Sequence, residues 1–116
     1  MKMEIKNAIE KRASVNDEWK EGVEQSWREL LDIIAKDYND FISFLENDCT
    51  GDDLAWLSEI YDEIIDIFPK QKIIDELRNV AMKFPNEVKE YNIESFINDA
   101  EEHLMFITDI HNSDYL

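Results

Sequence analysis

The spacing of the apolar residues constrains the fold more than any other feature of this sequence. They recur at steps of three and four, the period of a helix that buries one face, and no stretch keeps the strict alternation of a half-buried strand. Two glycines and two prolines also offer few of the turns that a many-stranded fold needs. We therefore predict an all-α protein. In the first third the recurring residues are Ile5, Ile9, Val15, Trp19, Val23, Trp27, Leu30, Leu31 and Ile34.

Capping residues and prolines divide this pattern into separate helices. The first third has one irregular step near Arg12, and Ser14 with Asp17 three residues later is typical of a capping box. Residues 1–36 therefore form either one long helix or two, and we favour a break near Ser14. Thr50 with Asp53 predicts a second capping box at the start of a later helix. The helices expected after the first third cover residues 38–46, 52–68 and 70–84, with the last from 92 onward.

Short connections between amphipathic helices predict antiparallel neighbours. We expect one domain, residues 1–116, folded as a compact bundle of about five amphipathic helices arranged as helical hairpins. The sequence leaves open whether residues 1–14 and 107–116 pack on that bundle. Trp19 and Trp27 fall on the apolar face of their helix and are assigned to the core. The last helix is expected to present Ile93, Phe96, Ile97, Ala100 and Leu104 inward.

The charge of the chain is high and is arranged in blocks. Its 28 acidic and 12 basic residues give a net charge of −16. Residues 37–69 carry ten acidic residues and no basic one, and residues 90–116 carry seven and none. Residues 70–89, with five basic and three acidic residues, have a net charge of +2. Such a surface repels phosphates, so direct nucleic-acid binding is disfavoured, whereas charge blocks can steer a basic partner.

The sequence also indicates where the protein acts. Its longest apolar runs are four residues, far short of the ~20 that cross a bilayer, so no membrane helix is expected. The charges at residues 2–6 stand where a signal peptide would have its apolar core. A single cysteine, Cys49, fits a reducing compartment. We expect a cytoplasmic protein.

The sequence matches none of the common catalytic or cofactor-binding motifs. It contains no phosphate-binding glycine loop, no nucleophile elbow and no zinc-binding helix. His103 and His111 are too widely spaced for one helical metal site. Residues 48–59 superficially resemble a calcium loop but place Asp53 where the turn needs glycine. The carboxylates near Cys49 should raise its thiol pKa and make it inert. We predict no enzyme activity, no cofactor and no metal.

One acidic stripe is the strongest candidate for a functional surface. A wheel of residues 52–68 puts four carboxylates opposite the apolar face, with Trp56 at the boundary. Like charges at this spacing destabilise a helix by roughly 0.2–0.5 kcal/mol per pair, so folding alone does not favour them. An aromatic edge beside such a stripe suits contact with a basic partner, although a merely solvated face remains the alternative. The predicted partner-binding residues are Asp52, Asp53, Trp56, Glu59, Asp62, Glu63 and Asp66.

A family resemblance rests on a segment of the same region. The motif is Leu54-x-Trp56-Leu57-Ser58-Glu59-Ile60-Tyr61-x-x-Ile64, followed by Phe84-Pro85 and Tyr91-Asn92-Ile93. In these residues, over about 50–105, the chain resembles the small acidic helical immunity proteins encoded beside bacterial polymorphic or contact-dependent toxins. The resemblance implies neutralisation of a toxin. Many such toxins are nucleases with a basic groove that an acidic inhibitor can occupy.

The leading hypothesis is therefore a non-catalytic intracellular inhibitor, an immunity protein that binds a basic toxin domain through residues 37–69. Two alternatives remain. The same surface suits a phage-type nucleic-acid mimic that inhibits a nuclease. The chain could also be a structural helical adaptor or homodimer in which charge provides only solubility. The oligomeric state stays open.

Overall fold

The regular structure of the protein consists of helices throughout the part that the structure describes. The computed structural model describes the backbone of residues 2–113 and the side chains of residues 3–108. The prediction of an all-α fold is confirmed. In chain order the elements are α1 (Lys2–Ser14), α2 (Lys20–Lys36), α3 (Tyr38–Asn47), α4 (Gly51–Leu57), the 3₁₀ turn η1 (Ser58–Ile60), α5 (Tyr61–Ile67), α6 (Gln71–Lys83), α7 (Pro85–Glu90) and α8 (Ile93–Ser113).

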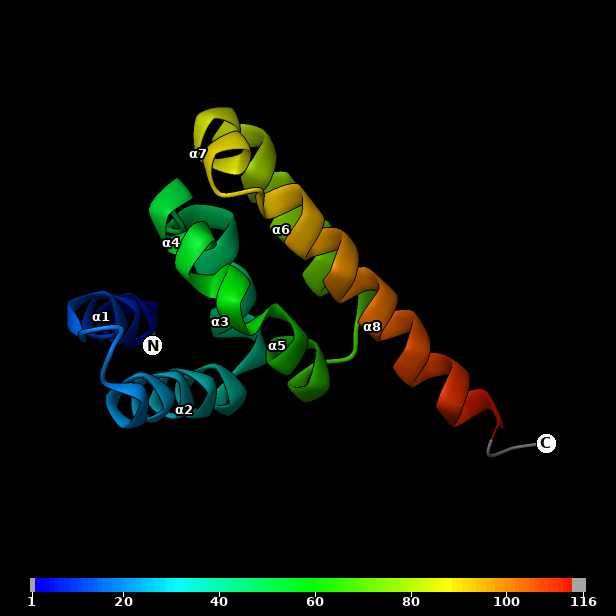
Figure 1. Cartoon of the computed structure of the whole chain (residues 1–116). Helices are drawn as coiled ribbons and strands as arrows, with labels where there is room; N and C mark the ends of the chain where they lie inside the picture. Colours follow the sequence, from blue (N-terminus) through cyan, green and yellow to red (C-terminus); the bar gives the residue numbers. More distant parts are fainter. Residues whose placement is uncertain (1, 114–116) are drawn as a thin grey trace.

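The helices do not simply form the consecutive hairpins that we expected. The α1 helix packs against α2, α3 and α4, while α6 packs against α3 and α4. The short link between α5 and α6 does not make them a packed pair, since each packs instead against the long α8 helix. In Figure 1, α8 runs past α6 and α5 and ends beyond the other helices. The α8 helix thus links α5 to α6 and α7.

The expected break near Ser14 is confirmed, but the prediction of a capping box formed by Ser14 and Asp17 is wrong. Ser14 ends α1, where its hydroxyl donates to the Lys11 carbonyl. Asp17 does not cap a helix, because its carboxylate pairs with Arg12. Helix α2 begins only at Lys20, with Trp19 as its N-cap.

The single helix predicted over residues 52–68 is wrong, because the segment divides into α4, η1 and α5. The Ser58 hydroxyl donates to the Ala55 carbonyl, and the Tyr61 hydroxyl donates to the Leu54 carbonyl at 2.9 Å. Side chains thus satisfy carbonyl groups at the end of α4, where the helix tightens and turns.

The capping box at the start of α4 is confirmed. Thr50 Oγ1 accepts a hydrogen bond from the Asp53 N–H at 3.1 Å, and Asp53 Oδ2 accepts one from the Thr50 N–H at 3.1 Å.

The short helix α7 was not predicted. As expected, α6 ends before Pro85, but Pro85 then opens α7, because the first position of a helix needs no N–H donor. Asn92 follows with a φ of 53°, a left-handed conformation that asparagine tolerates. This residue turns the chain from α7 into α8.

The core is formed by side chains from nearly every helix, and two predicted core residues lie outside it. Trp27 is partly buried against the core, but Trp19 is 59% exposed because it precedes the first turn of α2. Phe96 is 42% exposed, at the edge of the α8 face that buries Ile93 and Ile97. The fully buried large side chains include Ile5, Ile9, Leu30, Ile34, Phe41, Phe44, Leu45, Leu54, Leu57, Ile64, Ile65 and Ile73.

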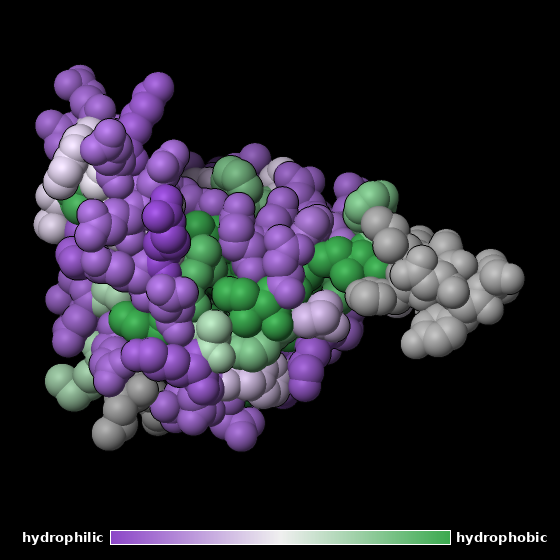
Figure 2. Space-filling view, turned by 90° about the horizontal axis from the view of Figure 1, so that it is seen from below, coloured by the Kyte–Doolittle hydropathy of each residue, from purple (hydrophilic) through white to green (hydrophobic). Residues whose placement is uncertain are grey.

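Hydrophilic side chains cover much of the surface. Seen from below, they border a hydrophobic strip in the middle of the molecule (Figure 2). Near the distal end of α8, Met105 and Phe106 are 61% and 62% exposed. Within the described residues, no helix combines the length and the apolar character that crossing a bilayer requires. The predictions for His111 and for the end of the 107–116 segment, from residue 109, lie outside the described side chains.

Candidate functional site

Most of the acidic residues in segment 37–69 reach solvent. Asp53 is the buried exception at 4% exposure, and its Oδ2 also lies 2.6 Å from Lys6 Nζ on α1. Asp53 therefore helps to hold α4 against α1, although it was among the predicted partner-binding residues. Eight of the ten are exposed, namely Asp37, Glu46, Asp48, Asp52, Glu59, Asp62, Glu63 and Asp66.

The four carboxylates of the predicted stripe are all exposed, but its two ends contact other helices. Glu59 Oε2 lies 3.3 Å from Arg12 Nη2, and Asp66 Oδ1 lies 2.7 Å from His103 Nε2 on α8. Between them, Asp62 and Glu63 form no ion pair or hydrogen bond through their side chains within residues 3–108. The middle of the stripe is thus the part most open to a partner.

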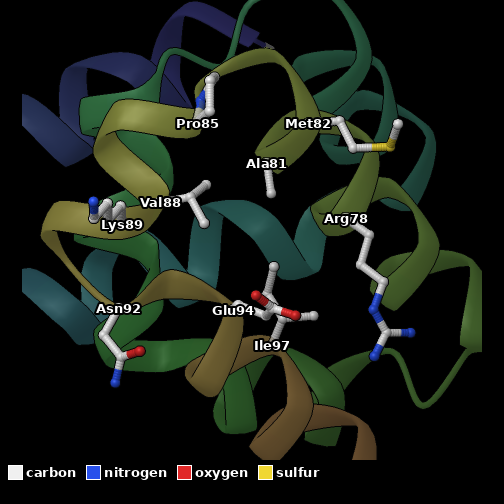
Figure 3. Close-up of a pocket in the computed structure, with 9 residues that line it drawn as sticks. All are labelled: Arg78, Ala81, Met82, Pro85, Val88, Lys89, Asn92, Glu94 and Ile97. Atoms are coloured by element: carbon white, nitrogen blue, oxygen red, sulfur yellow. The ribbon is translucent and has the colours of Figure 1, made fainter.

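A second candidate, a pocket, lies away from these residues. A space of about 640 Å³ separates parts of α6, α7 and α8, with Ala81, Val88 and Ile97 among its apolar walls (Figure 3). Arg78 lies at its edge and forms two hydrogen bonds of 2.9 Å with Glu101. The hydrogen bonds from Arg78 hold the Glu101 pKa down at about 2. None of the predicted partner-binding residues lines this pocket.

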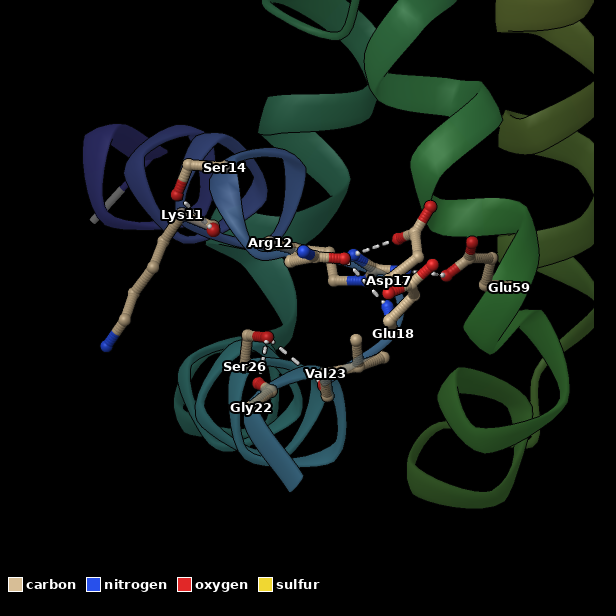
Figure 4. Close-up of polar contacts among 10 residues, drawn as sticks. Lys11, Arg12, Ser14, Asp17, Glu18, Gly22, Val23, Ser26 and Glu59 are labelled. Atoms are coloured by element: carbon tan, nitrogen blue, oxygen red, sulfur yellow. Dashed lines mark hydrogen bonds and ion pairs between the residues drawn. The ribbon is translucent and has the colours of Figure 1, made fainter. Parts of the chain in front are cut away.

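A buried arginine lies next to the candidate surface. Arg12 on α1 is 3% exposed, and its guanidinium carbon lies 5.0 Å from the ring centroids of both Trp27 and Trp56. Its Nη1 lies 3.1 Å from Asp17 Oδ1, and its Nη2 donates to Glu59. Figure 4 shows the guanidinium between these two carboxylates. Two aromatic rings and two acids therefore surround one cation.

The hydrogen bonding of Arg12 is incomplete within the described residues. Its Nε has no acceptor, and its Nη1 faces Asp17 without hydrogen-bond geometry. An arginine in this position carries a desolvation cost that the surrounding groups offset only in part.

The sequence analysis did not predict that Arg12 is buried, although the sequence contained an indication of it. Ile5, Ala8, Ile9 and Arg12 follow one another at steps of three, one and three, and all four are buried on one face of α1. The irregular step in the apolar pattern was therefore a charged residue at a buried position. Nothing in the spacing indicated its aromatic neighbours, which lie on other helices.

A smaller pocket of about 260 Å³ adjoins Trp56. It combines two aromatic rings with three carboxylates, and its lining comes from three separate segments: the α1–α2 connection, the α4–η1 region and the turn after α7. Three carboxylates beside the single positive charge of Arg12 leave a local charge of −2. We call this space the Trp56 pocket. It is lined by Asp17, Asp52, Ala55, Trp56, Glu59 and Tyr91.

The geometry offers no metal centre in the described part of the chain. No group of three or more His, Cys, Asp or Glu side chains there could hold an ion. The Thr50–Asp53 pair inside the calcium-like segment is engaged in helix capping.

Cys49, within the same segment, is buried. Burial, together with the charge of Asp53, raises the pKa of its thiol to about 12. The predicted direction is confirmed, but burial rather than neighbouring acid is the larger cause.

Comparison with known proteins finds no match among family models, curated proteins or solved structures.

Proposed function

We propose that this protein is a non-catalytic inhibitor, an immunity protein that binds and neutralises a cognate bacterial toxin in the cytoplasm. The observation that carries the proposal is the exposure of eight of the ten acidic side chains in segment 37–69, which contains no basic residue. A solvated surface of this charge attracts a basic groove from a distance.

The physical advantage of such a surface is speed. Complementary charge raises protein association toward ~10⁸–10⁹ M⁻¹s⁻¹ at low salt, which favours capture of a toxin before it acts. Asp62 and Glu63 supply uncompensated charge for this steering, while the partly buried Trp56 supplies an aromatic anchor.

The direct test uses the toxin domain that this proposal expects the adjacent gene to encode. Its association with this protein is measured by stopped-flow fluorescence between 25 and 500 mM NaCl. We expect the rate constant to fall at least about tenfold over this range, because salt screens the steering field. A rate that is indifferent to salt would overturn the electrostatic basis of the proposal.

Exposed apolar side chains support a second candidate, a helical adaptor or homodimer. Met105 and Phe106 are the observation that favours it, because both are more than half exposed near the distal end of α8. A dimer built there predicts that Phe106→Ser converts the protein to a monomer in sedimentation velocity. If the wild-type protein already sediments as a monomer at 100 µM, dimerisation is refuted.

A further inference from the structure

The Trp56 pocket has the composition of a receptor for one basic side chain. We propose that it binds an arginine side chain of the partner, an inference that rests on the proposed function and names the anchor of that interface. The incoming guanidinium would lie between Trp56 and Tyr91, among the carboxylates of Asp17, Asp52 and Glu59.

The protein's own Arg12 shows that these residues suit a guanidinium. Trp56, Asp17 and Glu59 already contact Arg12 through an aromatic ring and one carboxylate oxygen each. The same three side chains also line the pocket. A second guanidinium on the pocket side would therefore meet groups that the fold has arranged around the first.

The charge and exposure of the pocket favour a cation. With three carboxylates and one buried arginine, the site has a net charge of −2 before a ligand binds. Asp52 is exposed and forms no ion pair within the described residues, and Tyr91 is 46% exposed. A planar cation can stack on the aromatic faces and pair with the carboxylates at once.

The unpaired groups of Arg12 indicate a peptide rather than a free ion. Arg12 is 3% exposed, and its guanidinium lies against three of the side chains that line the pocket, yet Nε and Nη1 have no hydrogen-bond acceptor among residues 3–108. The Asp17 side chain is 79% exposed and can turn toward an incoming cation. That turn opens Nη1 to a main-chain carbonyl of the same peptide, an acceptor that a metal ion does not bring.

The test uses a minimal probe, acetyl-Gly-Arg-Gly-amide, with the citrulline peptide as the uncharged control. Binding is followed by NMR through the three tryptophan indole N–H signals, assigned by single Trp→Phe variants. We expect a saturable shift of the Trp56 signal with the arginine peptide, larger than the shift of Trp19, and none with citrulline. An equal response to the two peptides, or no shift of Trp56, overturns the proposal.

Two exposed aspartates provide a matched pair of variants. Asp52 and Asp62 each lie in the first turn of a short helix, but only Asp52 lines the pocket. Asp52→Asn should weaken peptide binding about threefold, as expected for the loss of one charge about 6 Å away in water. Asp62→Asn should leave the affinity for the peptide within about 1.5-fold of the wild-type value, because salt screens the effect of a more distant charge. Equal weakening by both variants would contradict a defined pocket.

Tyr91→Leu provides a variant that changes no charge. It removes one aromatic wall of the pocket and should also weaken binding of the arginine peptide. If Tyr91→Leu binds the peptide as the wild type does, the stacking part of the proposal is wrong.

The same variants separate this inference from the proposed function. Salt-sensitive binding of the toxin domain that Asp52→Asn and Tyr91→Leu leave unchanged would keep the proposed function and refute the pocket. Specific binding of the arginine peptide without any binding of the toxin domain would refute the immunity role and keep the guanidinium site.

Discussion

Replacing Arg12 tests how a charged side chain is accommodated at a buried position. Two substitutions separate its roles: Arg12→Met removes the charge but keeps a long apolar side chain, whereas Arg12→Ala removes both. Asp17 and Glu59 remain hydrated after either change, since their side chains are 79% and 44% exposed. Neither substitution therefore leaves an unpaired buried charge.

The magnitudes follow from the contacts of the guanidinium. Arg12→Met loses two contacts with aromatic rings, each about 1–2 kcal/mol when desolvated. It also removes two nitrogen atoms, Nε and Nη1, that lack hydrogen-bond acceptors within the described residues, each of which costs the wild type about 1–3 kcal/mol. These effects oppose each other, so we expect a change within about 2 kcal/mol. Arg12→Ala additionally leaves a void, and truncation at a buried position costs about 2–4 kcal/mol more.

Urea denaturation followed by circular dichroism measures both free energies of unfolding. Lys11→Met is the control, because Lys11 is exposed and pairs only with Glu29 among the described residues. We expect Arg12→Ala to be the least stable variant and Lys11→Met to resemble the wild type. If Arg12→Met is destabilised as much as Arg12→Ala, the charge matters more than the packing of the stem, and this reasoning is refuted.

Three further measurements test other parts of the structure. Thr50→Ala should lower the free energy of unfolding by about 1 kcal/mol in urea denaturation, because Asp53 N–H loses its cap, and an unchanged value would contradict that role. Cys49, with a thiol pKa of about 12, should react with a disulfide reagent at pH 8 much more slowly in the native protein than in urea. Glu101 has a pKa lowered to about 2 by Arg78, so its stabilising effect is present above about pH 4.5 and is lost as the pH falls toward 2. Wild type and Glu101→Gln should therefore converge in thermal stability over that range, and a constant difference would contradict the pairing.

Local signals in the sequence predicted the helical class and several boundaries. The Thr50–Asp53 capping box and the stops before Pro69 and Pro85 are short-range features, and they occur where expected. The division of residues 52–68 was missed because it depends on carbonyl groups taken by Ser58 and Tyr61. An ideal wheel assumes a constant angular step and cannot include such competing hydrogen bonds.

The candidate site was predicted in composition but not in geometry. Sequence reasoning selected Trp56, Glu59 and Asp52, and the structure brings these three together around one pocket. It could not anticipate that Asp17 and Tyr91 line the same space, because their approach depends on how distant helices pack. Asp53 was selected for its charge alone, although its capping contact also explained its presence.

The central claim is that segment 37–69 binds a basic partner through its exposed carboxylates. Its most direct test is the association rate of the toxin domain with the Asp62→Lys/Glu63→Lys double variant. The control is Asp99→Lys/Glu102→Lys, which reverses the same number of exposed charges on α8. The account predicts that the first variant slows association at least about tenfold more than the control at low salt. Equal rates for the two variants would contradict a defined acidic interface.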